Sequence, residues 1–369
     1  MKQDKTQHMK IKIIILSITL LLLSSILSAC AGAAGAANSW PGLTADQETA
    51  YVAYQNHIYA IQAENGVEKW RYPNEAERNV TFFADPALSQ DGQLIAGGYD
   101  NVLYSLNSEN GNKNWEFTQA QNSYIGGALV TADGIFAPDN NNEMFALNTD
   151  GGLRWTLETG DPNWAQPSTD SQCECIYLPS MDHTLYSINP ENGEVYWNTG
   201  ELGGALVGTP AISEDNKTLY VGTFGSEMIA INAENGNVIW RAPTDGWIWS
   251  GPALTDGRLY FGDLNGNFYA LDAANGSSVW EISAENLDGP ISNTPLVLED
   301  NIYFGTENGT FFAINTEGTP IWNQTIEGQL FTSPVAVGEL ILVASTNMES
   351  LLSAFTTDGA KRWTFAPQE

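Results

Sequence analysis

Eight tryptophans divide this chain into segments of nearly equal length, and no other feature constrains its fold as strongly. Neighbouring members of the series are 40 to 45 residues apart. The series is Trp70, Trp115, Trp155, Trp197, Trp240, Trp280, Trp322 and Trp363. A period of about forty residues with strand-like content is typical of four-stranded blades repeated around an axis. The sequence therefore predicts an all-β protein: an eight-bladed β-propeller of four-stranded antiparallel blades, spanning residues 41–369.

Each repeat contains the residues that such a blade requires. The first strand is expected beside a proline, or beside Gly127 in the third repeat; the prolines are Pro41, Pro86, Pro167, Pro210, Pro252, Pro295 and Pro334. We call these eight positions the landmark. An apolar second strand, a third strand of apolar and small residues and a fourth strand with the tryptophan should follow. Asp-Gly and Asn-Gly pairs occur at the expected turns between consecutive strands, because they tolerate the positive φ of tight hairpins.

A small residue in the third strand precedes each tryptophan by nine or ten positions. These residues are Ala60, Ser105, Ala146, Ser187, Ala230, Ala270, Ala313 and Ala354. An indole needs a flat surface for packing, and its N–H needs an acceptor when buried. We therefore expect each tryptophan to dock on a neighbouring blade at such a small residue, as a structural contact. The chain offers no spare strand, so side-chain packing should close the ring between the first and last blades.

The N-terminus has the features of a targeting segment. Four lysines precede an apolar run over residues 13–23, which Leu27-Ser28-Ala29-Cys30 follows. This ending resembles the lipobox of bacterial lipoproteins, and the resemblance implies a signal peptide over residues 1–29 and lipidation of Cys30. Residues 30–40 would form an Ala/Gly-rich tether that places the face it enters nearer the membrane. The alternatives are an ordinary cleaved signal peptide or a transmembrane anchor.

The charge of the chain limits its partners. Loss of residues 1–29, with four Lys and one Asp, changes the net charge from −30 to −33. Such a protein repels nucleic acid and anionic headgroups, so nucleic acid is not an expected partner, and a lipid anchor would be the only membrane attachment. The charge is compatible with an exported domain, a basic partner or divalent cations.

The repeat itself resembles a known family. The segment Tyr269-Ala270-Leu271-Asp272, followed by Asn275-Gly276 and Trp280, is similar to the pyrroloquinoline-quinone-type propeller repeat. Eight such repeats behind a lipobox resemble the lipoprotein subunit of the outer-membrane β-barrel assembly machinery. The resemblance covers essentially the whole mature chain. It implies fold more strongly than function, because the same blades serve quinoprotein dehydrogenases and non-catalytic scaffolds.

The two faces of the predicted ring should differ in chemistry. The turns within each half of a blade gather carboxylates on one face, the turn face: Asp91, Asp133, Asp170, Asp215, Asp256, Asp300, Glu64, Glu109, Asp150, Glu191, Glu234, Asp272, Glu317 and Asp358. Turn chemistry explains them, and cation binding or a basic partner is the alternative. The opposite face, the loop face, carries aromatic residues near the landmark: Phe83, Tyr124, Trp164, Trp247, Trp249 and Phe331. They form a candidate partner face for peptides or sugars, with packing between blades as the alternative.

The two remaining cysteines, Cys173 and Cys175, lie at the turn before a strand. Three interpretations compete: a local disulfide in an oxidising compartment, two free thiols, or half of a metal site with His183 nearby. The disulfide is favoured as a structural staple.

No catalytic, cofactor-binding or metal-binding residues emerge from the sequence. Quinoprotein dehydrogenases imply a calcium-bound quinone, a catalytic Asp and adjacent cysteines, whereas Glu174 separates the two cysteines here. No Gly-x-Gly phosphate loop and no Gly-x-Ser-x-Gly nucleophile elbow occurs. We expect a non-enzymatic, lipid-anchored scaffold of the cell envelope that needs neither the quinone nor calcium. Its partner would be an envelope protein in outer-membrane protein assembly, or, with a single membrane, it would face outward from the cell membrane. A carbohydrate- or solute-binding lipoprotein is the alternative, and a quinoprotein dehydrogenase the third.

Overall fold

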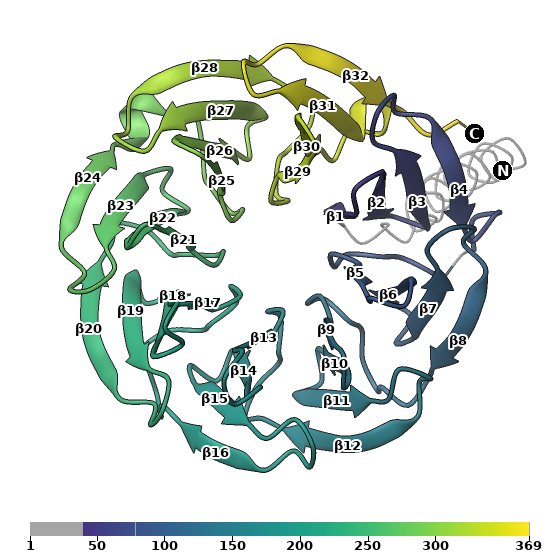
Figure 1. The fold of residues 1–369 in the computed structure, drawn as a ribbon, viewed down its shortest axis with the longest axis horizontal. Helices are drawn as coiled ribbons and strands as arrows, with labels where there is room; N and C mark the ends of the chain where they lie inside the picture. Colours follow the sequence, from purple (N-terminus) through teal and green to yellow (C-terminus); the bar gives the residue numbers. More distant parts are fainter. Residues whose placement is uncertain (1–39, 78, 369) are drawn as a thin grey trace, which may run out of the picture. The chain divides into compact units, whose positions relative to one another are not determined.

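A computed structural model describes residues 40–77 and 79–368. The predicted signal peptide, the lipidation site Cys30 and the tether up to residue 39 lie outside the described residues. The described chain forms eight four-stranded sheets, in each of which four consecutive strands pair with their sequence neighbours. The sheets surround a central axis as the blades of a propeller (Figure 1). The predicted fold class is confirmed.

The strands fall into four concentric sets (Figure 1). The innermost are β1 (Gly42–Ala45), β5 (Ala87–Leu88), β9 (Leu129–Thr131), β13 (Ser168–Thr169), β17 (Ala211–Ile212), β21 (Ala253–Thr255), β25 (Leu296–Leu298) and β29 (Val335–Val337). The second set is β2 (Thr49–Tyr54), β6 (Gln93–Gly97), β10 (Gly134–Pro138), β14 (Ile176–Pro179), β18 (Thr218–Thr223), β22 (Arg258–Gly262), β26 (Asn301–Gly305) and β30 (Leu340–Ala344). The third is β3 (His57–Gln62), β7 (Leu103–Asn107), β11 (Glu143–Leu147), β15 (Leu185–Ile188), β19 (Glu227–Asn232), β23 (Phe268–Asp272), β27 (Thr310–Asn315) and β31 (Leu352–Thr356). The outermost is β4 (Glu68–Tyr72), β8 (Lys113–Phe117), β12 (Leu153–Glu158), β16 (Val195–Asn198), β20 (Val238–Pro243), β24 (Ser278–Ile282), β28 (Pro320–Thr325) and β32 (Lys361–Phe365).

Blade 1 comprises β1–β4, and the following sets of four strands form blades 2 to 8. Two short 3₁₀ helices, η1 (Ala284–Asn286) and η2 (Met348–Ser350), interrupt the loops. Within the described residues, no helix is long and apolar enough to cross a membrane. The second and third strands are almost fully buried, and their side chains pack between neighbouring blades in clusters dominated by Tyr, Phe, Ile and Leu.

Each repeated tryptophan docks on the next blade. Its Nε1–H donates to a backbone carbonyl at the turn between the third and fourth strands of that blade, at 2.9–3.1 Å in all eight cases. The indole also lies on the glycine of that turn. A Cβ at Gly111, for example, would be 2.6 Å from the Trp70 ring, and its φ is +72°. This glycine is therefore needed for both the turn and the docking contact.

The prediction that each tryptophan docks at the small third-strand residue of a neighbouring blade was wrong. The small residue in the third strand faces the tryptophan of its own blade, as Ala60 faces Trp70 in the β3–β4 register. A β-bulge follows at this point in every blade, because the fourth strand contains one extra residue just before the tryptophan. Bulges bend a strand and re-aim its side chains. The small residue thus leaves space beside the tryptophan of its own blade. The turn of the next blade receives the indole ring.

Blades 8 and 1 close the ring without exchanging a strand. Trp363 Nε1 donates to Ala63 O at 3.0 Å, which repeats the contact found at the other junctions. Tyr54 Oη donates to Thr346 O at 2.7 Å, and apolar side chains of both blades share one buried cluster. Closure therefore depends on side-chain packing and hydrogen bonds between β1–β4 and β29–β32.

Candidate functional site

The aromatic residues predicted for the loop face occupy three different environments. Phe83 and Tyr124 are buried, so packing between blades describes them better than exposure to a partner. Trp164, Trp249 and Phe331 are half-buried at the centre of the ring, where they line a cavity. Trp247 is 54% exposed and stacks on Phe224, with ring centroids 5.1 Å apart.

Trp40 lies at the centre of this aromatic group, although it was not among the predicted site residues. Its ring centroid is 5.3 Å from Phe83, 6.2 Å from Trp249 and 6.3 Å from Phe331. Trp164 also contacts Trp249, at 6.3 Å. Aromatic side chains from separate blades thus converge on the first described residue of the chain.

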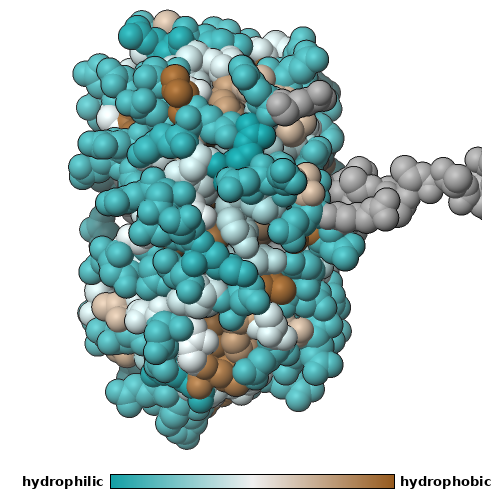
Figure 2. Space-filling view, turned by 90° about the vertical axis from the view of Figure 1, so that its right-hand side faces the viewer, coloured by the Kyte–Doolittle hydropathy of each residue, from teal (hydrophilic) through white to brown (hydrophobic). Residues whose placement is uncertain are grey.

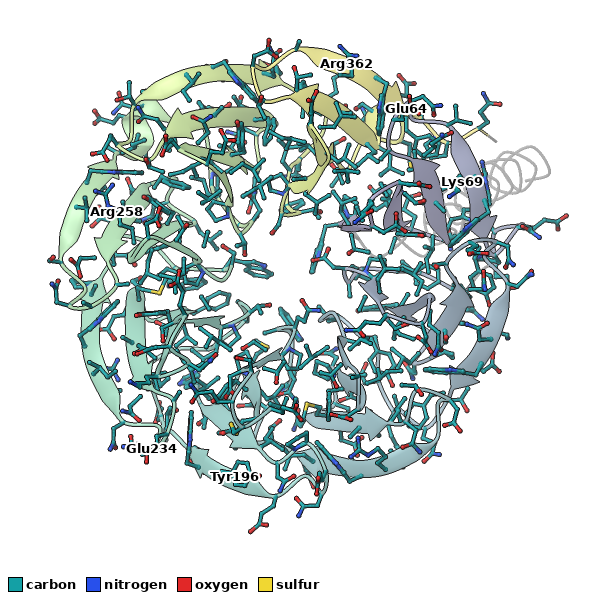
Figure 3. The ribbon with its side chains drawn as sticks, in the orientation of Figure 1. Glu64, Lys69, Tyr196, Glu234, Arg258 and Arg362 are labelled. Carbon is teal, nitrogen blue, oxygen red and sulfur yellow. A yellow bond between two sulfur atoms is a disulfide. The ribbon has the colours of Figure 1, made fainter. Side chains whose placement is uncertain are left out.

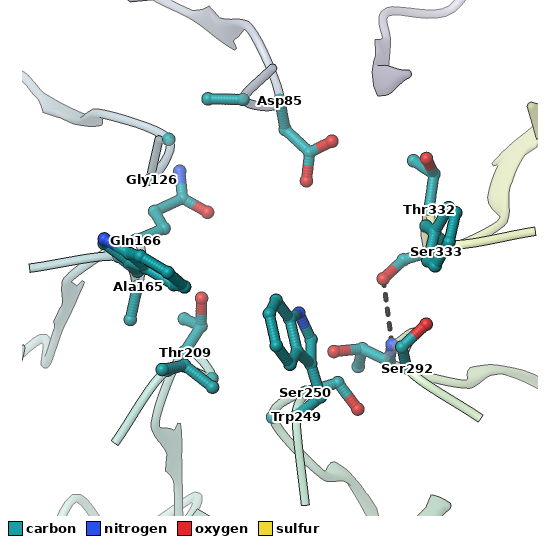
Figure 4. Close-up of a pocket in the computed structure, with 18 of the residues that line it drawn as sticks. Asp85, Gly126, Ala165, Gln166, Thr209, Trp249, Ser250, Ser292, Thr332 and Ser333 are labelled. Atoms are coloured by element: carbon teal, nitrogen blue, oxygen red, sulfur yellow. Dashed lines mark hydrogen bonds between the residues drawn. The ribbon is translucent and has the colours of Figure 1, made fainter. Parts of the chain in front are cut away.

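The cavity beside these rings has a volume of about 130 Å³, and residues that precede the innermost strands of all eight blades line it. The residues just before the landmark prolines and Gly127 form most of its wall (Figure 4). In chain order, the eight residues immediately before the landmark are Trp40, Asp85, Gly126, Gln166, Thr209, Gly251, Thr294 and Ser333. Comparison of the repeats at this position would have identified Asp85 from the sequence, because it is the only charged residue of the eight.

Among the described residues, Asp85 is the one charged residue that lines this cavity. Its side chain is exposed to the cavity, but the surrounding inner strands and loops desolvate the carboxyl group and raise its pKa to about 6. The Leu43 N–H donates to Oδ1 at 2.8 Å and partly opposes the rise in pKa. Figure 4 shows the Asp85 carboxylate and the Trp249 ring entering the pocket from facing sides.

These residues do not fit pyrroloquinoline quinone. The quinone is a flat molecule with several carboxyl groups, so its site should supply cations. The described part of the cavity wall contains no Lys, Arg or His, and its one charge, on Asp85, is negative. Cys173 and Cys175 lie before β14, on the turn face, and are absent from the cavity wall.

On the turn face, the predicted carboxylates are mostly exposed, with Asp170 as the buried exception. Tyr177 Oη donates to Asp170 Oδ2 at 2.6 Å, and burial followed by this hydrogen bond raises the pKa of Tyr177. Cys173 and Cys175 beside them are joined by a disulfide. Because both sulfur atoms are bonded to each other, they do not offer thiolate ligands to a metal.

The rim of the propeller contains a pattern that the sequence analysis missed. The extra residue of each β-bulge lies on an outermost strand, and its chemical character divides the rim in two. In blades 4 to 7 it is apolar and 41–52% exposed: Tyr196, Ile239, Val279 and Ile321. In blades 8, 1, 2 and 3 it is polar or basic: Arg362, Lys69, Asn114 and Arg154.

We call these halves the apolar arc and the polar arc. Figure 3 shows Lys69 and Arg362 on the outermost strands of the polar arc and Tyr196 on β16. The side that carries β4 and β8 is mostly hydrophilic, with isolated apolar side chains (Figure 2). The propeller is therefore asymmetric around its rim despite its regular blades.

Comparison with known proteins agrees with this architecture. The family model described as "Outer membrane protein assembly factor BamB" matches residues 28–172, 181–298 and 282–369. Similar solved structures include BamB from Moraxella catarrhalis, with 16% identity, a TM-score of 0.70, and coverage of 84% of this chain and 94% of that one. The computationally designed Ika8 protein gives 10% identity and a TM-score of 0.74, covering 87% and 98%. A europium-containing methanol dehydrogenase gives 15% identity and a TM-score of 0.69, covering 84% and 82%. At these identities, the structural likeness shows the fold alone. No curated protein matches the sequence.

Proposed function

The chain belongs to the family of the outer membrane protein assembly factor BamB, and from this premise we propose that it is a non-catalytic scaffold in outer-membrane protein assembly. It would be anchored to the cell envelope through a lipid on Cys30 and would bind a component of the machinery that inserts membrane β-barrels. The family match over nearly the whole propeller is the observation that carries this proposal. The loops and outer strands of the described chain surround a packed core, and residues on such loops commonly bind partners.

The apolar arc is the surface that best supports a protein partner. Four consecutive blades each expose one apolar side chain at the same structural position. Exposed acidic side chains, such as Glu191 and Glu234, occupy the turns beside these strands. A partner surface with apolar side chains flanked by basic ones would complement this arrangement. The outermost strands also present free edges to which an extended segment can add.

The test compares two changes at the same bulge position in opposite arcs. Ile239→Glu combined with Ile321→Glu places charge on the apolar arc, and Arg362→Glu is the control on the polar arc. All three side chains are exposed, so the fold should tolerate both variants. Each full-length protein is cross-linked in native membranes and purified. We expect wild type and the control to recover a β-barrel assembly component, and the double variant to lose most of it.

Two outcomes contradict the proposal in different ways. If the double variant recovers the component as well as wild type does, the apolar arc is not the binding surface. If wild type recovers no β-barrel assembly component, the assembly function itself is wrong.

Solute binding is a second candidate function, and the axial cavity with its aromatic wall favours it. A quinoprotein dehydrogenase has less support, because the methanol dehydrogenase likeness concerns the fold and the cavity wall opposes an anionic quinone.

A further inference from the structure

The axial cavity combines a carboxylate without a cationic partner and a wall of aromatic rings. Within the described residues, Asp85 receives one hydrogen bond, from the Leu43 N–H. Among the residues that the structure describes, no Lys, Arg or His lines the cavity to balance its charge. The carboxylate faces the cavity with one donor and no cationic partner, so a cation that enters the cavity can pair with it. The site is therefore electrostatically incomplete.

The tryptophan rings of the cavity wall are the second feature of the site. Trp40 and Trp249 meet nearly at right angles, with an interplanar angle of 89° and centroids 6.2 Å apart. Trp164 is tilted by 49° against Trp249. All three tryptophans line the cavity at different angles, and indole faces attract cations more strongly than other aromatic faces do. A carboxylate together with such rings is the combination that recognises an organic ammonium group.

The volume of the cavity and the net charge of the chain both agree with a small cationic ligand. A cavity of about 130 Å³ is far larger than one water molecule requires and has room for an ammonium head group. The remaining polar wall, which includes Gln166, Thr209 and Ser333, is neutral. The large negative charge of the chain attracts cations from solution and repels anionic ligands.

We propose that the axial cavity binds an alkylated or primary ammonium group, held by the Asp85 carboxylate and by the faces of Trp40, Trp164 and Trp249. The group could belong to a free small cation or to a lysine side chain of a bound protein, since both present the same chemistry. This site is separate from the apolar arc, so it can be tested independently of the proposed scaffold function.

The test uses the full-length protein and titrates it with choline, with 3,3-dimethylbutan-1-ol as the uncharged analogue of the same shape, and with paired short peptides that contain lysine or norleucine. Binding is measured by tryptophan fluorescence and by calorimetry. We expect saturable binding of choline or of the lysine peptide, and no binding of the uncharged partner in either pair. Preference for choline would indicate a free cation, and preference for the lysine peptide a protein side chain.

Matched variants locate the site. Asp85→Asn keeps the shape and an acceptor for Leu43 N–H, and should weaken cation binding by about tenfold or more. Trp249→Phe should weaken it less, because a smaller ring remains. Trp247→Phe, outside the cavity wall, is the control and should leave binding unchanged. Equal binding of charged and uncharged analogues, wild-type affinity in Asp85→Asn, or no binding of either cation would overturn the proposal.

Discussion

Replacing Phe145 with Tyr is expected to stabilise the propeller, because it supplies a hydrogen bond that the third blade lacks. Asp139, directly after β10, has 0% exposure. Its Oδ1 accepts the N–H groups of Asn141 and Glu143 at 2.8 and 2.9 Å. Within the described residues, its Oδ2 has no hydrogen-bond partner. A buried carboxylate oxygen without a donor is a substantial energetic cost.

The sixth blade shows how the same loop is completed. Asp263 stands at the position equivalent to Asp139, and its backbone N–H donates to Asn267 O at 3.0 Å, as the Asp139 N–H does to Glu143 O at 2.8 Å. Six residues after Asp263, Tyr269 Oη donates to Asp263 Oδ2 at 2.8 Å. Phe145 follows Asp139 by the same six residues. A hydroxyl on this ring should therefore reach the unpaired oxygen.

The magnitude follows from the pKa of Asp139. Burial raises this pKa from its ordinary value of 3.8 to about 6, which corresponds to at most about 3 kcal/mol. Because the pKa is higher in the folded chain, this group favours folding at low pH, and its contribution is lost as the pH rises through about 6. A hydroxyl bound to the ionised carboxylate is worth about 1.5–3 kcal/mol, less the cost of burying the hydroxyl. We expect a gain of about 1.5 kcal/mol at pH 8 and about 0.5 kcal/mol at pH 5.

Chemical denaturation at both pH values measures the effect. Wild type, Phe145→Tyr, Asp139→Asn and the double variant form a mutant cycle. In the Asp139→Asn background, the gain should lose its pH dependence, because residue 139 no longer ionises. Tyr269→Phe, the reverse change in the sixth blade, should destabilise the protein. A gain of equal size at pH 5 and pH 8, or one that keeps its pH dependence without Asp139, would refute the reasoning.

Two further predictions concern the closure of the ring and the disulfide. Trp363→Phe removes the hydrogen bond to Ala63 O and should lower the free energy of unfolding by about 1–2 kcal/mol. Amide exchange, measured by mass spectrometry, should become fastest in β1–β4 and β29–β32. Equal acceleration in all blades would contradict this. Reduction of the Cys173–Cys175 bond, which closes a very short loop, should cost at most about 1.6 kcal/mol. Thermal unfolding with and without reductant measures this loss of stability. A larger loss would mean that the disulfide stabilises structure beyond its own turn.

Much of the fold could be predicted because each blade repeats the same local chemistry. The tryptophan period sets the number of blades, and the Pro and Asn-Gly positions set their strands and turns. The docking surface could not be predicted in the same way. Ala60 and Gly66 are both small and both precede a docked tryptophan at constant spacing, so the sequence does not distinguish the residue that faces Trp70 within its blade from the one that receives Trp363. The β-bulge separates these roles, and it is a property of strand pairing.

The candidate site was harder to predict because function resides where the repeats differ. The shared aromatic position includes Trp164 and Trp249, which line the cavity, but also Phe83 and Tyr124, which are buried between blades. Asp85 occurs once in eight repeats, so a search for recurrence excludes it. In a closed ring, however, residues at one repeat position surround the same axis, and a single carboxylate there faces the space shared by all eight. Departures from the repeat at axial and rim positions therefore carry more functional information in a propeller than the repeat itself does.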